Sequence, residues 1–297
     1  MTLFVQTLLH YPLKSAQGIV INNATLGPLG LAMDRRWVLI DPQGRFVSQR
    51  NCPLMGGLRV EAIDQTLKID WQRQSVTAVA NPQDCLAVSI WTDQVQGWGV
   101  AESVNLQLSA WLGQSVRLVY SPDQIQRQVD PDYAGVGHRT AFSDGFPLLL
   151  ISQASLDALS AGFGQPLEML RFRPNIVIGG DCVPFAEDQW RQIQIGDVVL
   201  DLVKPCSRCV IPSLDPQTQQ PTDGVLRFLA QTRRRADGKV YLGQNAVVQR
   251  SAPLADPNAM LLDSMPRVVQ TDLAISHRQG FADFLQQGQR MTVLASA

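Results

Sequence analysis

Cysteine is scarce in this chain of 297 residues: only five occur, and three of them stand alone in sequence. A chain this long can bury a core that needs no disulfide bonds, whereas small secreted scaffolds that depend on them are cysteine-rich. The N-terminal stretch MTLFVQTLLHYPLKS has no positive charge before its apolar run and no small-residue cleavage site. It is therefore not typical of a secretory leader. These absences predict a reduced, cytoplasmic protein.

The sequence also lacks an excess of either charge and any long apolar run. Its 25 Lys and Arg residues oppose 26 Asp and Glu residues, which gives a net charge of −1. A near-neutral chain offers no general attraction for nucleic acid or for an anionic membrane. Apolar runs such as FPLLLI at 146–151 are far shorter than the ~18 residues of a membrane-spanning helix. We expect no nucleic-acid partner and no membrane span.

What the sequence does contain is a succession of short strand patterns. Residues 1–120 hold segments rich in Val, Ile, Thr and aromatic residues, separated by turn residues, and one amphipathic helix is predicted at 100–113. Residues 36–48 predict a hairpin around the turn D-P-Q-G. The first part, 1–120, is therefore interpreted as a β module. The fold class expected for the chain is mostly β with α.

The second part, 121–297, begins with a polar connection at 121–145, a length that in compact domains is usually functional or disordered. A buried strand then leads to Ser152, which is placed as the N-cap of a helix. Strand patterns follow at 171–180, 192–209 and 239–250, with one further helix pattern at 227–238. We predict a second β domain with peripheral helices.

Two of the five cysteines, Cys206 and Cys209, are three positions apart in KPCSRCVIPSLDP, residues 204–216. A zinc site needs four ligands, and the other cysteines and histidines are isolated in sequence. A redox pair of the thioredoxin type needs a helix start at its first cysteine, but Val-Ile-Pro after Cys209 favours a strand or loop. The residues alone also allow two small buried side chains or a single thiolate ligand.

Four other stretches carry residues suited to an anion. They are YPLKS with Lys14 and Ser15, MDRRW with Arg35 and Arg36, RFRPN with Arg173 and Asn175, and CSRC with Ser207 and Arg208. Adjacent side chains on a strand point to opposite sides, so Arg35 and Arg36 cannot both be buried without partners. Singly, each stretch is also compatible with a solvated surface. Together, guanidinium forks, a lysine and short polar donors favour a phosphate or a polyanionic cofactor.

These motifs occur in an order that resembles the MOSC-domain proteins with an N-terminal MOSC β-barrel module. The resemblance rests on YPLKS, GLAMDRRWVLID, FSDGFPLLLISQASL, FRPNIVI and KPCSRCVIPSLDP. It covers residues 1–250 and is nearest to the mitochondrial amidoxime-reducing components and their bacterial counterparts. It implies a β-barrel module at 1–120, followed by a MOSC β-barrel domain at 121–297 with an insert at about 250–284.

The resemblance also implies the cofactor and its contacts. The family binds a molybdenum cofactor, in which a molybdopterin carries the metal. The resemblance implies a function that is independent of pyridoxal phosphate. Cys209 matches the metal ligand, and Asp144 matches an acidic residue beside the metal. The positions that match the contacts to the pterin and its phosphate are Lys14, Ser15, Arg35, Arg173, Asn175, Ser207 and Arg208.

The function implied is an oxidoreductase that reduces small N-hydroxylated substrates. The sequence has no C-x4-C-x2-C run and no G-x-G-x-x-G after a predicted strand, so it shows no iron–sulfur or nucleotide module of its own. Electrons are therefore expected from a separate donor, a flavin or iron–sulfur reductase. The alternative is a non-catalytic protein that binds or carries the molybdenum cofactor or sulfur.

Overall fold

The computed structural model describes residues 2–249 and 284–297. Strands dominate it, as expected for a mostly β protein with a few helices. The predicted insert at 250–284 lies outside the described residues except for its last residue. Within the described ranges, no helix has both the length and the apolar character to cross a membrane.

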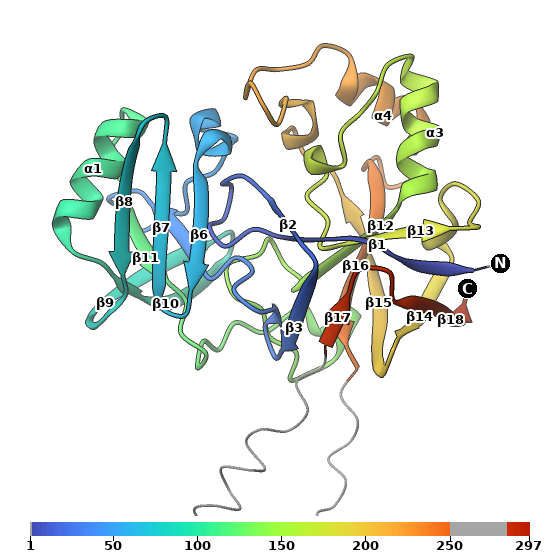
Figure 1. Cartoon of the computed structure of the whole chain (residues 1–297), viewed down its shortest axis with the longest axis horizontal. Helices are drawn as coiled ribbons and strands as arrows, with labels where there is room; N and C mark the ends of the chain where they lie inside the picture. The colour runs from blue at the N-terminus through green and yellow to red at the C-terminus, as the bar shows by residue number, and fades with distance from the viewer. Residues whose placement is uncertain (1, 250–283) are drawn as a thin grey trace, which may run out of the picture.

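A closed barrel of seven strands forms the centre of one half of the molecule (Figure 1). Its strands are β1 (Leu3–His10), β12 (Leu148–Ser152), β13 (Ile176–Gly180), β14 (Trp190–Ile195), β15 (Val198–Ser207), β16 (Tyr241–Val248) and β18 (Arg290–Ser296). The order is β13-β12-β16-β15-β14-β18-β1, and antiparallel pairing of β1 with β13 closes the ring. The short strand β2 (Ile19–Ile21) pairs with β1 outside the ring.

The other half holds two smaller sheets on the left of Figure 1. One is β6 (Arg59–Ile63), β7 (Thr66–Trp71) and β8 (Gln74–Val79); the other has the order β5 (Trp37–Ile40), β11 (Arg117–Tyr120), β10 (Asp93–Gly99) and β9 (Asn81–Ile90). A third small sheet joins β17 (Phe284–Gln286), β3 (Asn23–Gly27) and β4 (Gly30–Leu31).

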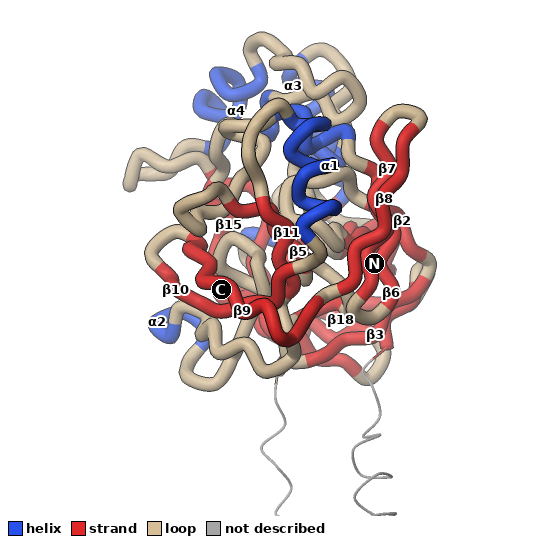
Figure 2. Tube along the Cα trace, turned by 90° about the vertical axis from the view of Figure 1, so that its left-hand side faces the viewer, coloured by secondary structure: helices blue, strands red, loops and turns tan. Residues whose placement is uncertain are grey.

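The helices lie outside the sheets, as predicted. They are α1 (Glu102–Leu112), α2 (Pro131–Ala134), α3 (Gln153–Phe163) and α4 (Val225–Arg233), with 3-10 turns η1 (Pro53–Gly57), η2 (Met169–Arg171), η3 (Ala186–Asp188) and η4 (Ile211–Ser213). Figure 2 shows α1, α3 and α4 in the upper half of that view, with α2 at the lower left. The side chain of Ser152 caps α3, and Gly113 ends α1 in the left-handed conformation, so both boundary predictions are confirmed.

Separate apolar cores stabilise the two halves. Trp37, Leu67 and Leu108 are fully buried in the smaller half, whereas Val5, Ile176 and Leu200 are fully buried inside the barrel. Val5 comes from β1. The first strand of the chain therefore packs in the core of a barrel whose other strands all lie after residue 120. The division of the chain near residue 120 into two domains stays a prediction.

The predicted hairpin at 36–48 forms, although it is short. The Asp41 amide donates to the carbonyl of Arg45, and the Val47 amide donates to the carbonyl of Leu39. An antiparallel bridge joins Ile40 to Phe46 between these two bonds. The other edge of β5 pairs along its whole length with β11. The second arm of the turn runs on to Arg50, which lines the cavity described next.

Candidate functional site

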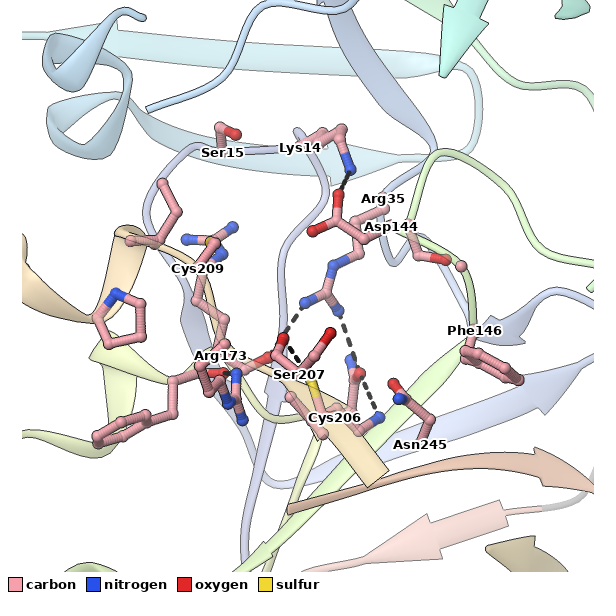
Figure 3. Close-up of a pocket in the computed structure, with 18 of the residues that line it drawn as sticks. Lys14, Ser15, Arg35, Asp144, Phe146, Arg173, Cys206, Ser207, Cys209 and Asn245 are labelled. Carbon is pink, nitrogen blue, oxygen red and sulfur yellow. Dashed lines mark hydrogen bonds and ion pairs between the residues drawn. The ribbon is translucent and has the colours of Figure 1, made fainter. Parts of the chain in front are cut away.

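One cavity of about 460 Å³ brings together the nine residues that the family resemblance implies as metal or cofactor contacts (Figure 3). They are Lys14, Ser15, Arg35, Asp144, Arg173, Asn175, Ser207, Arg208 and Cys209. Arg36, which was also considered for an anion, lies outside this lining and pairs with Asp123. The contributing segments are far apart in sequence: the loops after β1 and before β5, the long connection ahead of β12, the turn before β13, and the end of β15. The cavity therefore depends on the closure of the barrel against the smaller half.

Two arginines of the cavity flank one buried tyrosine. The guanidinium carbons of Arg35 and Arg173 lie 4.3 Å and 4.2 Å from the ring centre of Tyr11. Burial raises the pKa of Tyr11 to about 12, so the ring stays neutral and its faces attract both cations. The Tyr11 hydroxyl donates to the carbonyl of Pro174 over 3.0 Å, which ties this group to the strand that follows.

The two arginines differ in how their charge is balanced. Arg35 donates from Nη1 to the carboxylate of buried Asp34 over 2.6 Å and to Oδ1 of Asn175 over 3.1 Å. Arg173 donates to the carbonyl of Ala16 over 2.8 Å, and no ion pair to it is recorded within the described ranges. Burial lowers the pKa of Arg173 to about 10, which leaves it charged near neutral pH. Arg173 is therefore a buried cation that an anionic ligand can neutralise.

The backbone at three of these residues adopts a conformation that non-glycine residues rarely use. The φ angles are +69° at Ser15, +47° at Arg35 and +53° at Arg173. A side chain in this region costs about 1–3 kcal/mol, and such residues concentrate at ligand-binding and catalytic sites. All three were predicted as cofactor contacts from motif alone. Their strained backbone is an independent sign that this cavity is a functional site.

On the other wall of the cavity, charged groups connect Lys14 to the thiol of Cys209. The Lys14 ammonium lies 2.5 Å from Oδ1 of Asp144, and Arg50 Nη2 lies 3.6 Å from Oδ2 of the same carboxylate. Arg50 Nη2 also lies 3.2 Å from Sγ of Cys209. The ring of Trp91 supports the Arg50 guanidinium, whose carbon lies 4.8 Å from the ring centre.

This chain of contacts changes the titration of its members. Burial lowers the pKa of Lys14 to about 8, although the Asp144 carboxylate limits the fall. The Asp144 side chain is 60% exposed, but that surface lines the cavity. Enclosure there opposes ionisation, yet Lys14 and then Arg50 outweigh it and hold the pKa of Asp144 below its ordinary value of 3.8. Both partners are therefore charged near neutral pH.

Two of the predicted contact residues, Arg208 and Asn175, form hydrogen bonds mainly with the protein itself. Arg208 donates to the carbonyls of Phe172 and Leu242 over 2.7–3.0 Å. Asn175 is 1% exposed; its amide nitrogen donates to the carbonyl of Leu9, and its oxygen accepts from Arg35. Both residues line the cavity and position their neighbours, so their direct contact with a ligand stays a prediction. Ser207 is exposed.

Sequence reasoning missed three further cations of the cavity, Arg50, Arg171 and Lys204. Arg50 follows a turn in the smaller half and belongs to no motif that marks an anion site. Arg171 and Lys204 were quoted only as the first residues of the RFRPN and cysteine motifs. Only the folded chain shows that they reach the same cavity as Cys209.

The lining residues fit a polyanionic cofactor with a soft metal. Seven are cationic, namely Lys14, Arg35, Arg50, Arg171, Arg173, Lys204 and Arg208, whereas Asp144 is the one acidic side chain in the lining. Guanidinium and ammonium groups bind phosphate, and a thiolate is a soft metal ligand. In the part of the chain that the structure describes, no three His, Cys, Asp or Glu side chains gather as a metal site. Cys209 would be a lone protein ligand, with the remaining donors supplied by the cofactor.

The fold and the site define a class: a mostly β protein with a cation-lined cavity that also holds the thiols of Cys206 and Cys209. The family model described as "MOSC N-terminal beta barrel domain" matches residues 2–115, and the one described as "MOSC domain" matches residues 137–255. The chain belongs to the MOSC-domain proteins that carry this N-terminal domain. The predicted family is thus confirmed.

Several proteins are similar over most of the chain. Mitochondrial amidoxime-reducing component 1 of Mus musculus is 30% identical, over 72% of this chain and 66% of that protein. The same component of Danio rerio is 29% identical, over 84% of this chain and 82% of that protein. Molybdenum cofactor sulfurase of Oryza sativa subsp. japonica is 28% identical, over 80% of this chain and 32% of that protein. The chain spans about two thirds of the mouse protein's length.

Proposed function

We propose that this protein is a molybdenum-cofactor-dependent reductase of N-hydroxylated compounds that receives its electrons from a separate donor protein. The observation that carries the proposal is the cavity whose lining combines the Cys209 thiol with seven cationic side chains. Similarity to amidoxime-reducing components supports the reaction class. The cytoplasmic compartment stays a prediction from the sequence.

The residues divide the task of holding the cofactor. Arg173, Arg35 and Lys14 supply positive charge for a terminal phosphate, and Ser15 and Ser207 supply short hydroxyl donors. Cys209 supplies the thiolate for the metal. The bound cofactor would supply two-electron reduction at molybdenum, and the protein supplies placement and proton control. Asp144 is paired with Lys14 and Arg50 and would hold a water molecule or pass a proton at its carboxylate oxygens.

The proposal is tested by analysing purified protein for molybdenum and pterin, and then for turnover of an N-hydroxylated base with reduced viologen dye. Cys209→Ser should lose bound molybdenum and turnover, because it removes the lone thiolate ligand. Cys206→Ser is the matched control and should retain most of both. Equal and complete loss of metal in the two variants would instead favour a site that uses both cysteines.

A second candidate function is a protein that carries the molybdenum cofactor or sulfur without reducing a substrate. Similarity to molybdenum cofactor sulfurase favours it. Such a protein would contain stoichiometric pterin but would not turn over N-hydroxylated compounds with reduced viologen. Transfer of its cofactor to an apoenzyme, at a rate that Arg173→Ala accelerates, would support this candidate.

A further inference from the structure

One side of the cavity lies away from the groups proposed to hold the cofactor. Figure 3 shows Phe146 and Asn245 well separated from Arg173 and Cys209 across the view. All four residues line the same cavity. The side with Phe146 and Asn245 is therefore available for a second ligand beside the cofactor.

Lys204 projects its ammonium group among aromatic rings on that side. The ammonium nitrogen lies 3.8 Å from the ring centre of Tyr133 and 5.7 Å from that of Phe146. The two rings meet edge to face, with centres 6.5 Å apart. Cation–π contact restricts the motion of the ammonium group. A ligand that binds it therefore loses less free energy to the ordering of the lysine side chain.

The ammonium of Lys204 keeps capacity for another partner. It has three donor hydrogens. Within the described ranges, one of them is used, in a hydrogen bond to Oδ2 of Asp130 over 3.3 Å. The side chains of this pair are 32% and 41% exposed, so the ion pair is worth little and a ligand anion can compete for it. Asn245 lies opposite Lys204 in the strand register, and its amide donates to the Lys204 carbonyl over 3.2 Å.

We propose that Lys204, Phe146 and Asn245 form a substrate subsite that selects N-hydroxylated compounds with a flat unsaturated ring and an anionic substituent such as a carboxylate. Tyr133 is outside the cavity lining and supports the subsite by holding the Lys204 ammonium. This inference rests on the proposed function and adds the substrate class. The ring of Phe146 provides contact for the flat part of the substrate. The fixed ammonium provides a charge-assisted hydrogen bond to the anion, which a neutral substrate cannot use.

The test compares an arylamidoxime with the same compound carrying a ring carboxylate, using the full chain loaded with cofactor. The quantity measured is the ratio of kcat/KM for the carboxylated compound to kcat/KM for the neutral one. Lys204→Met should lower this ratio about tenfold, the size expected for loss of one charge-assisted contact. Lys204→Arg should restore it. Lys68→Met is the matched control, because Lys68 is an ion-paired strand lysine outside the cavity, and it should keep the wild-type ratio.

Two results would overturn the subsite. One is an unchanged ratio in Lys204→Met; the other is a loss of bound pterin in that variant, which would assign Lys204 to the cofactor. Dissociation constants of the two compounds, titrated into the same proteins, give a second ratio that does not depend on turnover. If no variant and no wild type turns over either compound, the proposed reaction fails. The binding ratio then decides on the subsite: a lower ratio in Lys204→Met supports it, and an unchanged ratio excludes it.

Discussion

Arg50 connects the smaller half of the molecule to Cys209 and Asp144 through single contacts. Its guanidinium rests on Trp91 and reaches both the Cys209 thiol at 3.2 Å and the Asp144 carboxylate at 3.6 Å. Arg50 and Trp91 come from the smaller half, whereas Asp144 and Cys209 come from segments that flank the barrel strands. We interpret Arg50 as a positioning residue for the predicted metal ligand.

Replacing Arg50 should weaken cofactor retention. Arg50→Gln removes the cation nearest the Cys209 thiol and the contact that positions it, so pterin and molybdenum content should fall roughly tenfold under dilution. The measurement is the metal and pterin content after gel filtration. Arg45→Gln serves as the control, because Arg45 is an exposed arginine of the same turn, paired with Asp41 and outside the cavity. Normal cofactor content in Arg50→Gln would exclude this role.

The Lys14–Asp144 pair should stabilise the fold in a pH-dependent way. The pKa of Asp144 is held below its ordinary 3.8, so its contribution is complete above about pH 5 and is lost as pH falls through and below 3.8. Asp144→Asn should lower the free energy of unfolding by about 1 kcal/mol near pH 6, less than for a fully buried pair because Asp144 is 60% exposed. Urea unfolding between about pH 3 and pH 6 should show this difference shrinking towards acid. A difference that stays constant over this range contradicts the assignment.

At the residue scale, the motifs predicted which side chains meet but not how each is held. All nine predicted contact residues line one cavity. They could be predicted because each stands in a short motif and the motifs follow a recognisable order. The left-handed backbone at Ser15, Arg35 and Arg173 could not be predicted, since no glycine marks it. Nor could the internal bonding of Arg208, which depends on carbonyls more than thirty residues away along the chain.

At the scale of elements, one buried arginine organises the long connection between the two halves. Arg127 donates to the carbonyls of Ala141, Ser143 and Asp144, and its Nε lies 2.7 Å from Oδ2 of Asp93. The connection was predicted as functional or disordered. In the structure, these bonds of Arg127 hold the last turn of the connection, which ends at Asp144.

Arg127→Met should release that turn. The substitution leaves carbonyls without their donor, each at a cost of about 1–3 kcal/mol where water cannot replace it. Amide hydrogens of residues 140–145 should then exchange faster, and cofactor content should fall. Arg139→Met is the matched control: Arg139 lies in the same connection but donates to carbonyls of Asp123 and Ile125. Equal exchange in the two variants would show that Arg127 does not hold the turn.

Elements with a local signal were the ones predicted well. Ser152 and Gly113 mark helix ends by side-chain chemistry and glycine conformation, and both are confirmed. The hairpin at 36–48 also forms, with backbone bonds at Asp41–Arg45 and Leu39–Val47. Its pairing with β11 on the other edge of β5 was not predicted. Local turn chemistry cannot show which distant strand pairs with the free edge of a hairpin.

At the scale of the whole molecule, closure of the barrel joins segments from both ends of the described chain. Strand β1 pairs with β13 and with β18, a contact between residue 3 and residue 291. Strand patterns predicted the β class, but pairing over such separations leaves no mark in local periodicity. The cavity exists because this closure brings Lys14 and Cys209 to the same place.

The last prediction concerns electron supply to the whole protein. Cys209 is assigned to the metal, and the other four cysteines do not form the clustered run that an iron–sulfur centre uses. We therefore expect that purified, loaded protein does not oxidise NADH or NADPH at the expense of an N-hydroxylated compound. It should turn over with reduced viologen, or once a flavin or iron–sulfur reductase is added. The control is the same assay with protein shown to be free of flavin.

The donor should be attracted by charge. Seven cationic residues against one acidic residue in the cavity lining favour an acidic protein surface at its mouth. The rate with a protein donor should therefore fall as salt is added, because exposed charges are screened over ~10 Å at 0.1 M. The rate with reduced viologen, a small radical cation, should not fall in the same way. Steady NADH-driven turnover by flavin-free protein would place the electron path inside the chain and would make the assignment of Cys209 wrong.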